Sequence, residues 1–178
     1  AAIARKIGYP VVAKIVSPAV VHKSDVKGVV VGIKDDETLV RTLARLSKID
    51  GFAGMLIAEM VRGVELIIGA KNDFQFGPMV LLGMGGVGVE IYKDVSLRMA
   101  PLKPKDAEHM IGELAARKLL TGYRGSTPVH LNALTKTLVH FSKRIMELAD
   151  VVESVDLNPV MCNAKSCIVA DARIMLKK

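Results

Sequence analysis

Asn158 and Asp171 carry the two side chains best suited to hold a divalent metal ion together. They fall in the segments 154–161 and 167–176, which are predicted strands joined by a tight turn at Ala164-Lys165. In that register, residues whose numbers add up to 329 lie opposite each other across the ladder. An amide oxygen and a carboxylate side by side can share one Mg²⁺, whose other ligands are water and phosphate oxygens.

The same register predicts the two faces of this hairpin. Asp156 faces Arg173, and both share a polar face with Asn158 and Asp171. Pro159 is the weak point, because proline cannot donate to a ladder and marks an edge or a bulge, which would shift the register. An ordinary amphipathic hairpin with one Asp–Arg pair is the alternative. The opposite face is expected to be core and consists of Val155, Leu157, Met161, Ile168, Ala170, Ala172 and Ile174.

Two further candidates lie near the start of the chain. Lys14 stands inside an apolar predicted strand, 9–17, where its ammonium is costly unless it reaches water or an anion. It is therefore either a phosphate-binding lysine or a lysine at a strand edge. His22 lies in the polar loop 18–27 and could donate to phosphate or accept a phosphoryl group, although a surface histidine is the commoner case.

The middle of the chain offers carboxylates at strand ends and a run of glycines. Glu59 lies near the end of predicted strand 55–61, and Glu65 begins predicted strand 64–71. A strand-end carboxylate beside free backbone groups can read adenine and ribose, whereas an exposed glutamate at a turn is the simpler interpretation. The glycine-rich run 83–90 lacks the Lys-Ser/Thr of a P-loop and leads into an apparent strand, so it is not a dinucleotide fingerprint either. Its glycines could supply backbone N–H groups that bind an anion, or merely form a tight turn.

Composition narrows the class of protein. The chain has 178 residues, of which 51% are hydrophobic and 4% aromatic, with no tryptophan. This is typical of an α/β-type enzyme core and argues against a stacking platform for single-stranded nucleic acid. The net charge of +7 suits an anionic partner, such as a nucleotide, coenzyme A or nucleic acid, but the basic residues are dispersed. No apolar stretch reaches transmembrane length.

The two cysteines, Cys162 and Cys167, face each other in the tight-turn register, where a disulfide is geometrically conceivable. The sequence shows no export signal, so we expect free thiols in a reducing cytosol.

Helices and antiparallel strands are predicted in mixed order, which indicates an α+β fold rather than a doubly wound sheet. The first residues resemble the end of a helix closed by Gly8, and we expect a preceding segment to be missing. Helices are also expected from Asp36, from Pro104 and over 131–148. Asp50-Gly51 separates the first of these helices from the next strand. We therefore predict two subdomains, 1–54 and 55–178.

Taken together, these segments resemble the ATP-grasp subunit of NDP-forming acyl-CoA synthetases, of the ADP-forming acetyl-CoA synthetase β type. Succinyl-CoA synthetase β subunits are more distantly similar, and the same module occurs fused in bacterial protein-acetylating enzymes. The resemblance spans essentially the whole chain. It is carried by the motifs Gly8–Lys14, Ser17-Pro18, His22–Val26, Gly28-Val29, Phe76–Pro78, Gly85–Val87, Glu90, Lys93–Ser96, Arg98, Ala100–Leu102, Gly122–Gly125, Asp156–Pro159 and Asp171–Arg173.

The resemblance implies an ATP-grasp fold with the nucleotide between two subdomains, and a role for each matching residue. It implies that Lys14 holds the ATP phosphates and that Asn158 and Asp171 ligate Mg²⁺. It implies that Glu59 and Val61 read adenine and that Glu65 reads the ribose. It also implies that His22 relays a phosphoryl group to or from a histidine of the CoA-ligase partner. Two positions depart from the family pattern: Lys27, where the family usually has glycine, and Gly88, where it usually has a bulky residue.

We therefore expect one half of a cytoplasmic ADP-forming acyl-CoA synthetase, which uses ATP/ADP and Mg²⁺ and works with a CoA-binding partner, on the same chain or separate. No nucleic acid or membrane is expected as a partner. One alternative is the ATP-grasp part of a fused protein acetyltransferase with a regulatory role. The other is a non-catalytic basic module that binds nucleic acid.

Overall fold

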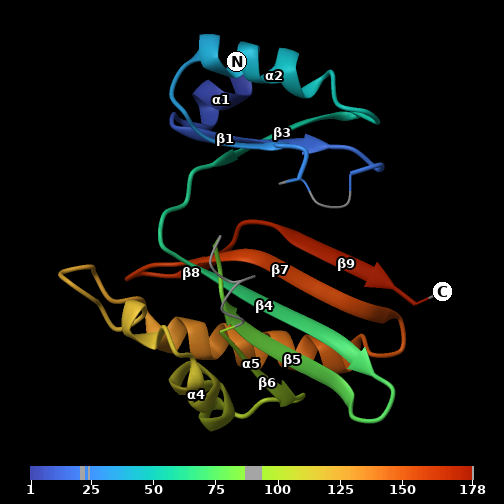
Figure 1. Cartoon of the computed structure of the whole chain (residues 1–178), viewed down its shortest axis with the longest axis vertical. Coiled ribbons are helices and arrows are strands. Elements are labelled where there is room, and N and C mark those ends of the chain that lie inside the picture. The colour runs from blue at the N-terminus through green and yellow to red at the C-terminus, as the bar shows by residue number, and fades with distance from the viewer. Residues whose placement is uncertain (21–22, 24, 87–93, 178) are drawn as a thin grey trace. The chain divides into compact units, whose positions relative to one another are not determined.

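The computed structural model describes residues 1–20, 23, 25–86 and 94–177, and the chain forms two compact units, Ala1–Met60 and Val61–Lys178 (Figure 1). Both units combine helices with antiparallel sheet, so the predicted α+β class is confirmed. The predicted boundary at 54/55 differs from this division, because strand β3 (Gly54–Glu59) pairs along its whole length with the first strand of the chain. No helix among the described residues is both long and apolar enough to cross a membrane.

The first unit is a three-stranded sheet with helices on one side (Figure 1). Its strands lie in the order β2-β1-β3, and both pairings are antiparallel. Ala4 and Leu39, from the two helices, pack on Val11 and Ala13 of the central strand and form the core of the unit. Besides β3, its elements are α1 (Ala2–Ile7), β1 (Val11–Val16), β2 (Val29–Ile33) and α2 (Asp36–Leu46).

Polar contacts join the two helices of this unit. Asp35 caps α2, since its carboxylate accepts the Thr38 N–H at 2.7 Å. Arg5 donates to the Asp36 carboxylate, as does the Tyr9 hydroxyl at 2.6 Å. Both bonds hold the pKa of Asp36 below its ordinary value, and the same contact raises the pKa of Tyr9 to about 12.

The second unit is an antiparallel sheet with helices α4 and α5 on one face (Figure 1). The strand order is β6-β5-β4-β7-β8, and β9 also pairs with β7, beyond the end of β8. Its elements are β4 (Val64–Asp73), β5 (Gly77–Met84), β6 (Val95–Met99), α4 (Pro104–Glu113), the 3₁₀ helix η1 (Arg117–Leu119), α5 (Leu131–Glu147), β7 (Val152–Cys162), β8 (Cys167–Val169) and β9 (Ala172–Leu176).

Helix α5 presents its apolar stripe to this sheet, as its spacing predicts. Leu134, Leu138 and Ile145 are buried, whereas Leu148, the last residue of the predicted stripe, lies past the end of the helix and is exposed. Ser142 is fully buried in the same face, and its hydroxyl accepts the Leu102 N–H at 2.9 Å. This bond fastens the entry to α4 onto α5, because a buried N–H without a partner is costly.

Candidate functional site

The hairpin of β7 with β8 and β9 has the predicted turn and register. Asn163 N–H donates to Ser166 O at 2.9 Å, which closes a tight turn around Ala164-Lys165. Cys162 pairs with Cys167 and Asp156 with Arg173, so both pairs add up to 329. The pairing of the two strands is therefore confirmed on both sides of Pro159.

Asn158 and Asp171 are brought together by this register. The Asn158 N–H donates to Asp171 O at 3.1 Å, in the gap between β8 and β9. Residues directly opposite in an antiparallel pair carry their side chains on the same face. Asn158 is exposed and Asp171 half-buried, so an amide and a carboxylate stand next to each other at an accessible position of the sheet.

The core face of β7 differs from the expectation after Pro159. Along the neighbouring strand β4, Leu66 pairs with Val160 but Ile68 pairs with Leu157, so Asn158 and Pro159 together stand opposite a single residue. This is a β-bulge, and it reverses which side chains point to the core. Val160 and Cys162 are buried there instead of the predicted Met161.

The outer strand of the hairpin also departs from the prediction. Ala172 and Ile174 were expected in the core, but all of β9 is exposed, Ile174 by 59%. Strand β9 pairs with β7 alone and lies at the edge of the sheet, away from the helices that cover its middle (Figure 1). Ala172 and Ile174 pair with Leu157 and Val155, so they lie on the expected face of the sheet. No element among the described residues covers that face at β9.

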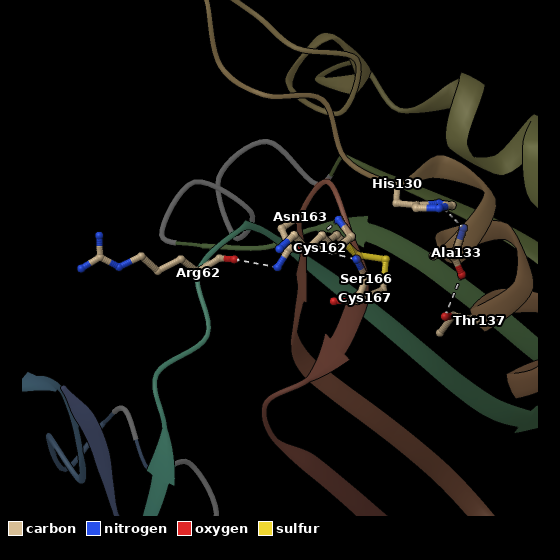
Figure 2. The surroundings of a disulfide bond; sticks show 9 residues. Arg62, His130, Ala133, Thr137, Cys162, Asn163, Ser166 and Cys167 are labelled. Atoms are coloured by element: carbon tan, nitrogen blue, oxygen red, sulfur yellow. Dashed lines mark hydrogen bonds between the residues drawn. A yellow bond between two sulfur atoms is a disulfide. The ribbon is translucent and has the colours of Figure 1, made fainter. Parts of the chain in front are cut away.

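Cys162 and Cys167 are joined as a disulfide, so the expectation of free thiols is wrong for this structure (Figure 2). The Asn163 side chain beside them accepts the Lys165 and Ser166 N–H groups and donates to Arg62 O at 3.2 Å. A Cβ added at Gly63 would lie 2.3 Å from Cys162 O, which shows how closely the two segments pack. The tip of the hairpin thus holds the segment that leads into β4.

Helix α5 begins on the same hairpin tip. The His130 N–H donates to Asn163 O at 2.8 Å, and its side-chain Nδ1 accepts the Ala133 N–H at 3.1 Å as the cap of the helix (Figure 2). The hairpin tip therefore fixes both the entry to β4 and the first turn of α5.

Glu65, the predicted ribose ligand, lies in β4 beside the glycine-rich run. It is exposed and pairs with Met161 of β7, while its carbonyl oxygen accepts the Gly85 N–H at 2.6 Å. A Cβ at Gly85 would come within 2.7 Å of the Glu65 backbone, and one at Gly86 would lie 3.5 Å from Glu65 Oε2. Gly85 therefore allows the turn to approach Glu65, a role that the glycine spacing alone did not reveal, whereas the contact at Gly86 is an ordinary one.

Glu59 and Val61 lie on either side of the boundary between the units. Glu59 is the exposed last residue of β3 and pairs with Val11, whereas Val61 is half-buried and follows the strand. Because Val11 points into the helix-covered core, Glu59 lies on that face of the sheet.

Lys14 lies in the central strand of the first unit, between Val29 of β2 and Leu56 of β3. Only 7% of it is exposed. Side chains alternate along the strand, so Lys14 points to the face opposite the one covered by α1 and α2. It is therefore not a solvated lysine at a strand edge, and it does not share a face with Glu59.

His22, Gly88 and Glu90 lie outside the described residues, as does the predicted extended segment 87–92. The end of the His22 loop is described. Lys27, where the resembling family usually has glycine, has φ 50, which is the left-handed conformation that glycine adopts freely. A Cβ at Gly28 would lie 2.5 Å from Ile15 Cγ2 of β1 and 2.9 Å from Lys23 O, so this glycine allows close packing both against β1 and within the loop.

The motif around Asp94 and Arg98 holds the end of α4. The Asp94 carboxylate accepts the Ala115 and Ala116 N–H groups at 2.7 and 2.8 Å. Ser96 and Arg98 both donate to Glu113, and these bonds hold the pKa of Glu113 below its ordinary value. In the described part of the motif these side chains therefore have structural partners.

No group of three or more His, Cys, Asp or Glu side chains that could hold a metal ion occurs among the described residues. Asn158 and Asp171 form a smaller donor set, of the kind that Mg²⁺ uses when phosphate and water complete its coordination.

The model of the ATP-grasp domain family matches residues 1–176. The β subunit of acetate–CoA ligase [ADP-forming] I from Pyrococcus furiosus is 45% identical over 96% of this chain and 77% of its own length. The acetate–CoA ligase [ADP-forming] I of Archaeoglobus fulgidus is 43% identical over 98% of this chain. This chain spans only 26% of that second relative.

A solved structure agrees over nearly the whole chain. The dinucleotide-forming acetyl-coenzyme A synthetase 1 of Ca. Korarchaeum cryptofilum, in complex with coenzyme A, Ca-AMPCP and HgCl⁺, has a TM-score of 0.91 and 44% identity, and covers 99% of this chain and 80% of that one. The same enzyme has been solved with coenzyme A and Mg-AMPPCP, with its phosphohistidine segment pointing towards the nucleotide-binding site (TM-score 0.85, 45% identity, 99% of this chain and 80% of that one). None of these names supports the acetyltransferase or nucleic-acid alternative. With a family model that matches almost its full length, the chain belongs to the ATP-grasp family and is homologous to the ATP-grasp part of ADP-forming acetate–CoA ligases.

Proposed function

We propose that this chain is the ATP-binding part of an ADP-forming acyl-CoA synthetase. The whole enzyme would interconvert acyl-CoA, ADP and phosphate with free acid, coenzyme A and ATP. This part would transfer a phosphoryl group between Mg·ATP and a histidine. The observation that carries the proposal is the likeness over 99% of the chain to a synthetase whose structures hold adenine nucleotide analogues.

Asn158 and Asp171 are the proposed Mg²⁺ ligands. The backbone hydrogen bond between them holds an amide oxygen and a carboxylate on neighbouring strands, and both side chains are at least partly accessible. Such a pair of hard oxygen donors fits Mg²⁺, which neutralises phosphate charge when it is bound. Because Asn158 and Asp171 offer two ligands, the other coordination positions would be taken by phosphate oxygens and water.

The other proposed roles rest on the motifs that this chain shares with the family. Lys14 is proposed to bind the phosphates, because it matches the phosphate-binding lysine of the family motif and is held in the central strand of its sheet. Glu59 and Val61 are proposed to read adenine and Glu65 the ribose. Electrostatic stabilisation and positioning supply most of the rate in this class of reaction. His22 remains a proposed phosphoryl carrier on the strength of its motif alone.

The partner is proposed to be a coenzyme-A-binding part, either fused or separate. The relatives include both a single long chain and a β subunit, and this chain matches only the ATP-grasp portion of the long one. We place the enzyme in the cytoplasm, where nucleotide and coenzyme A are both available.

Calorimetric titration of Mg·ATP into the purified chain, with Mg·GTP in parallel, tests this function. We expect wild-type protein to bind Mg·ATP and Asp171→Ala to lose the Mg²⁺-dependent part of that binding, with its circular dichroism spectrum and melting temperature unchanged. Glu153→Ala is the matched control, because it removes an exposed carboxylate from the same strand, β7. Mg²⁺-dependent binding that survives intact in Asp171→Ala would refute the metal site, and a wild-type chain that binds neither nucleotide would refute the function.

A further inference from the structure

The loop 121–128 is a projection on a rigid base. All eight of its residues are exposed, whereas Leu120 and Val129 on either side are 0% and 6% exposed and lie in the core of the second unit. The Val129 N–H donates to Leu120 O at 2.9 Å, which closes the base of the loop. The loop extends away from the sheet beyond η1 (Figure 1). Its position is therefore set by the core, although none of its own residues is buried.

The inside of the loop is ordered around Tyr123 and Arg124. The Tyr123 N–H donates to Ser126 Oγ at 2.9 Å, and the Ser126 N–H donates back to Tyr123 O at 3.1 Å. The Arg124 guanidinium lies 5.3 Å from the centroid of the Tyr123 ring, within cation–π range. Arg124 has φ 49, an unfavourable conformation for arginine that persists only where the surroundings impose it. The loop thus holds a tyrosine and an arginine together in solvent at a conformational cost.

The sequence on either side of the loop is cationic. The stretch from Leu114 to Met146 contains no Asp or Glu, but six Lys and Arg residues. Arg117, Lys118 and Arg124 are exposed, and none of them has an ion-pair partner in the described part of the chain. Their charge is therefore exposed to solvent in the described part of the chain.

We propose that loop 121–128 docks into an acidic recess on the coenzyme-A-binding part of the enzyme. This inference rests on the function proposed above. A convex loop suits a protein surface, since small ligands prefer concave sites, and tyrosine and arginine dominate the binding energy of protein interfaces. A partner of sufficient size exists in the relatives, because this chain covers only 26% of the single-chain ligase, which leaves most of that chain available to contact the ATP-grasp part.

The test is calorimetric titration of the chain with the coenzyme-A-binding part encoded in the same genome, supplied as a separate polypeptide. We expect Arg124→Ala and Tyr123→Ala each to weaken association tenfold or more, as for interface hot spots, and Lys48→Ala, an exposed cation of the first unit, to leave it unchanged. Association should also weaken as salt is raised from 50 to 200 mM, because it pairs opposite charges. Absence of association by the wild type, or equal affinity of the loop variants, would overturn the proposal.

Arg124→Gly separates binding from folding. Glycine relieves the positive φ, so we expect this variant to melt no lower than wild type and still to lose association tenfold or more. Loss of association only in variants that also melt lower would overturn the docking role. A parallel titration with a 20-nucleotide DNA tests the competing interpretation. Binding of that DNA that depends on Arg124 would overturn the proposal and identify nucleic acid as the partner. Mg·ATP binding by the same variants keeps the two proposals apart, because it should match wild type if only docking is lost.

Discussion

The tip of the hairpin at 162–167 and the loop at 121–128 are both turns of the second unit, but they are built for different ends. Asn163, the disulfide and the close approach of Gly63 fasten the hairpin tip to the entry of β4. The loop has one reciprocal pair of hydrogen bonds between Tyr123 and Ser126, and all of it is exposed. The turn residues of the hairpin tip therefore contact a neighbouring segment, whereas the hydrogen bonds of Tyr123 and Ser126 run within the loop itself.

The glycines show the difference most clearly. Gly63 is required because the backbone of Cys162 occupies the space that a side chain at position 63 would need. The φ of Gly63 is not in the left-handed region. Gly125 has open space around it but has φ 83. A glycine in a sequence thus indicates a constraint without telling whether a neighbouring segment or the backbone conformation imposes it.

The largest expected effect is that of Gly63→Ala. Its methyl group would overlap the Cys162 carbonyl, which belongs to the backbone of a paired strand and cannot turn aside, so we expect the free energy of unfolding to fall by about 3 kcal/mol. Gly125→Ala, which is only conformationally strained, should cost about 1 kcal/mol. Urea denaturation measures both, and equal losses would show that the two turns do not differ in packing.

Opening the disulfide is expected to have the next largest effect. The bond closes a loop of only a few residues, and the chain-entropy model gives it about 2 kcal/mol. We expect a dithiol reductant to lower the urea midpoint of the wild type and to leave that of Cys167→Ser unchanged. An unchanged wild-type midpoint under reductant would contradict a stabilising role for the bond.

Asn163 and Ser126 provide a matched pair of side-chain hydrogen bonds. Asn163→Ala removes the two bonds within the hairpin turn and the bond to Arg62 O, so we expect a loss of about 1.5 kcal/mol. Ser126→Ala removes one exposed bond in the loop and should cost about 0.5 kcal/mol. Thermal melts of both variants compare the two losses of stability. A larger loss for Ser126→Ala would show that the loop depends more on its side-chain bond than the hairpin turn does.

The smallest expected effect has opposite signs in the two turns. Arg124→Gly relieves a positive φ, and after the entropic cost of glycine we expect stability to rise by about 0.5 kcal/mol. Lys165→Gly changes a residue of the hairpin turn that has no positive φ, and should lower stability by about 0.5 kcal/mol. Denaturant curves that move in the same direction for both variants would show that Arg124 is not strained.

Much of the fold could be predicted from local pattern. The apolar spacing of α5 and the start of α4 at Pro104 appear in the structure where the sequence placed them. The division between the units could not be predicted in this way, because the composition of Gly54–Glu59 fits a strand of either unit. Only the pairing of this segment with β1 assigns it to the first unit. Of the candidate site, the pairing of Asn158 with Asp171 could be predicted, whereas the approach of Gly85 to Glu65 joins segments 20 residues apart and could not.

The sequence by itself determined the hairpin register in which numbers add up to 329, because a tight turn at Ala164-Lys165 leaves only one pairing for the strands that it joins. The tertiary structure alone decided which side chains of that hairpin are buried. The bulge at Asn158-Pro159 exists only relative to β4, a strand far away in the sequence, and it turns Val160 and Cys162 towards the helices in place of Met161. Register within a hairpin is a local property, whereas burial depends on what the rest of the chain packs against it.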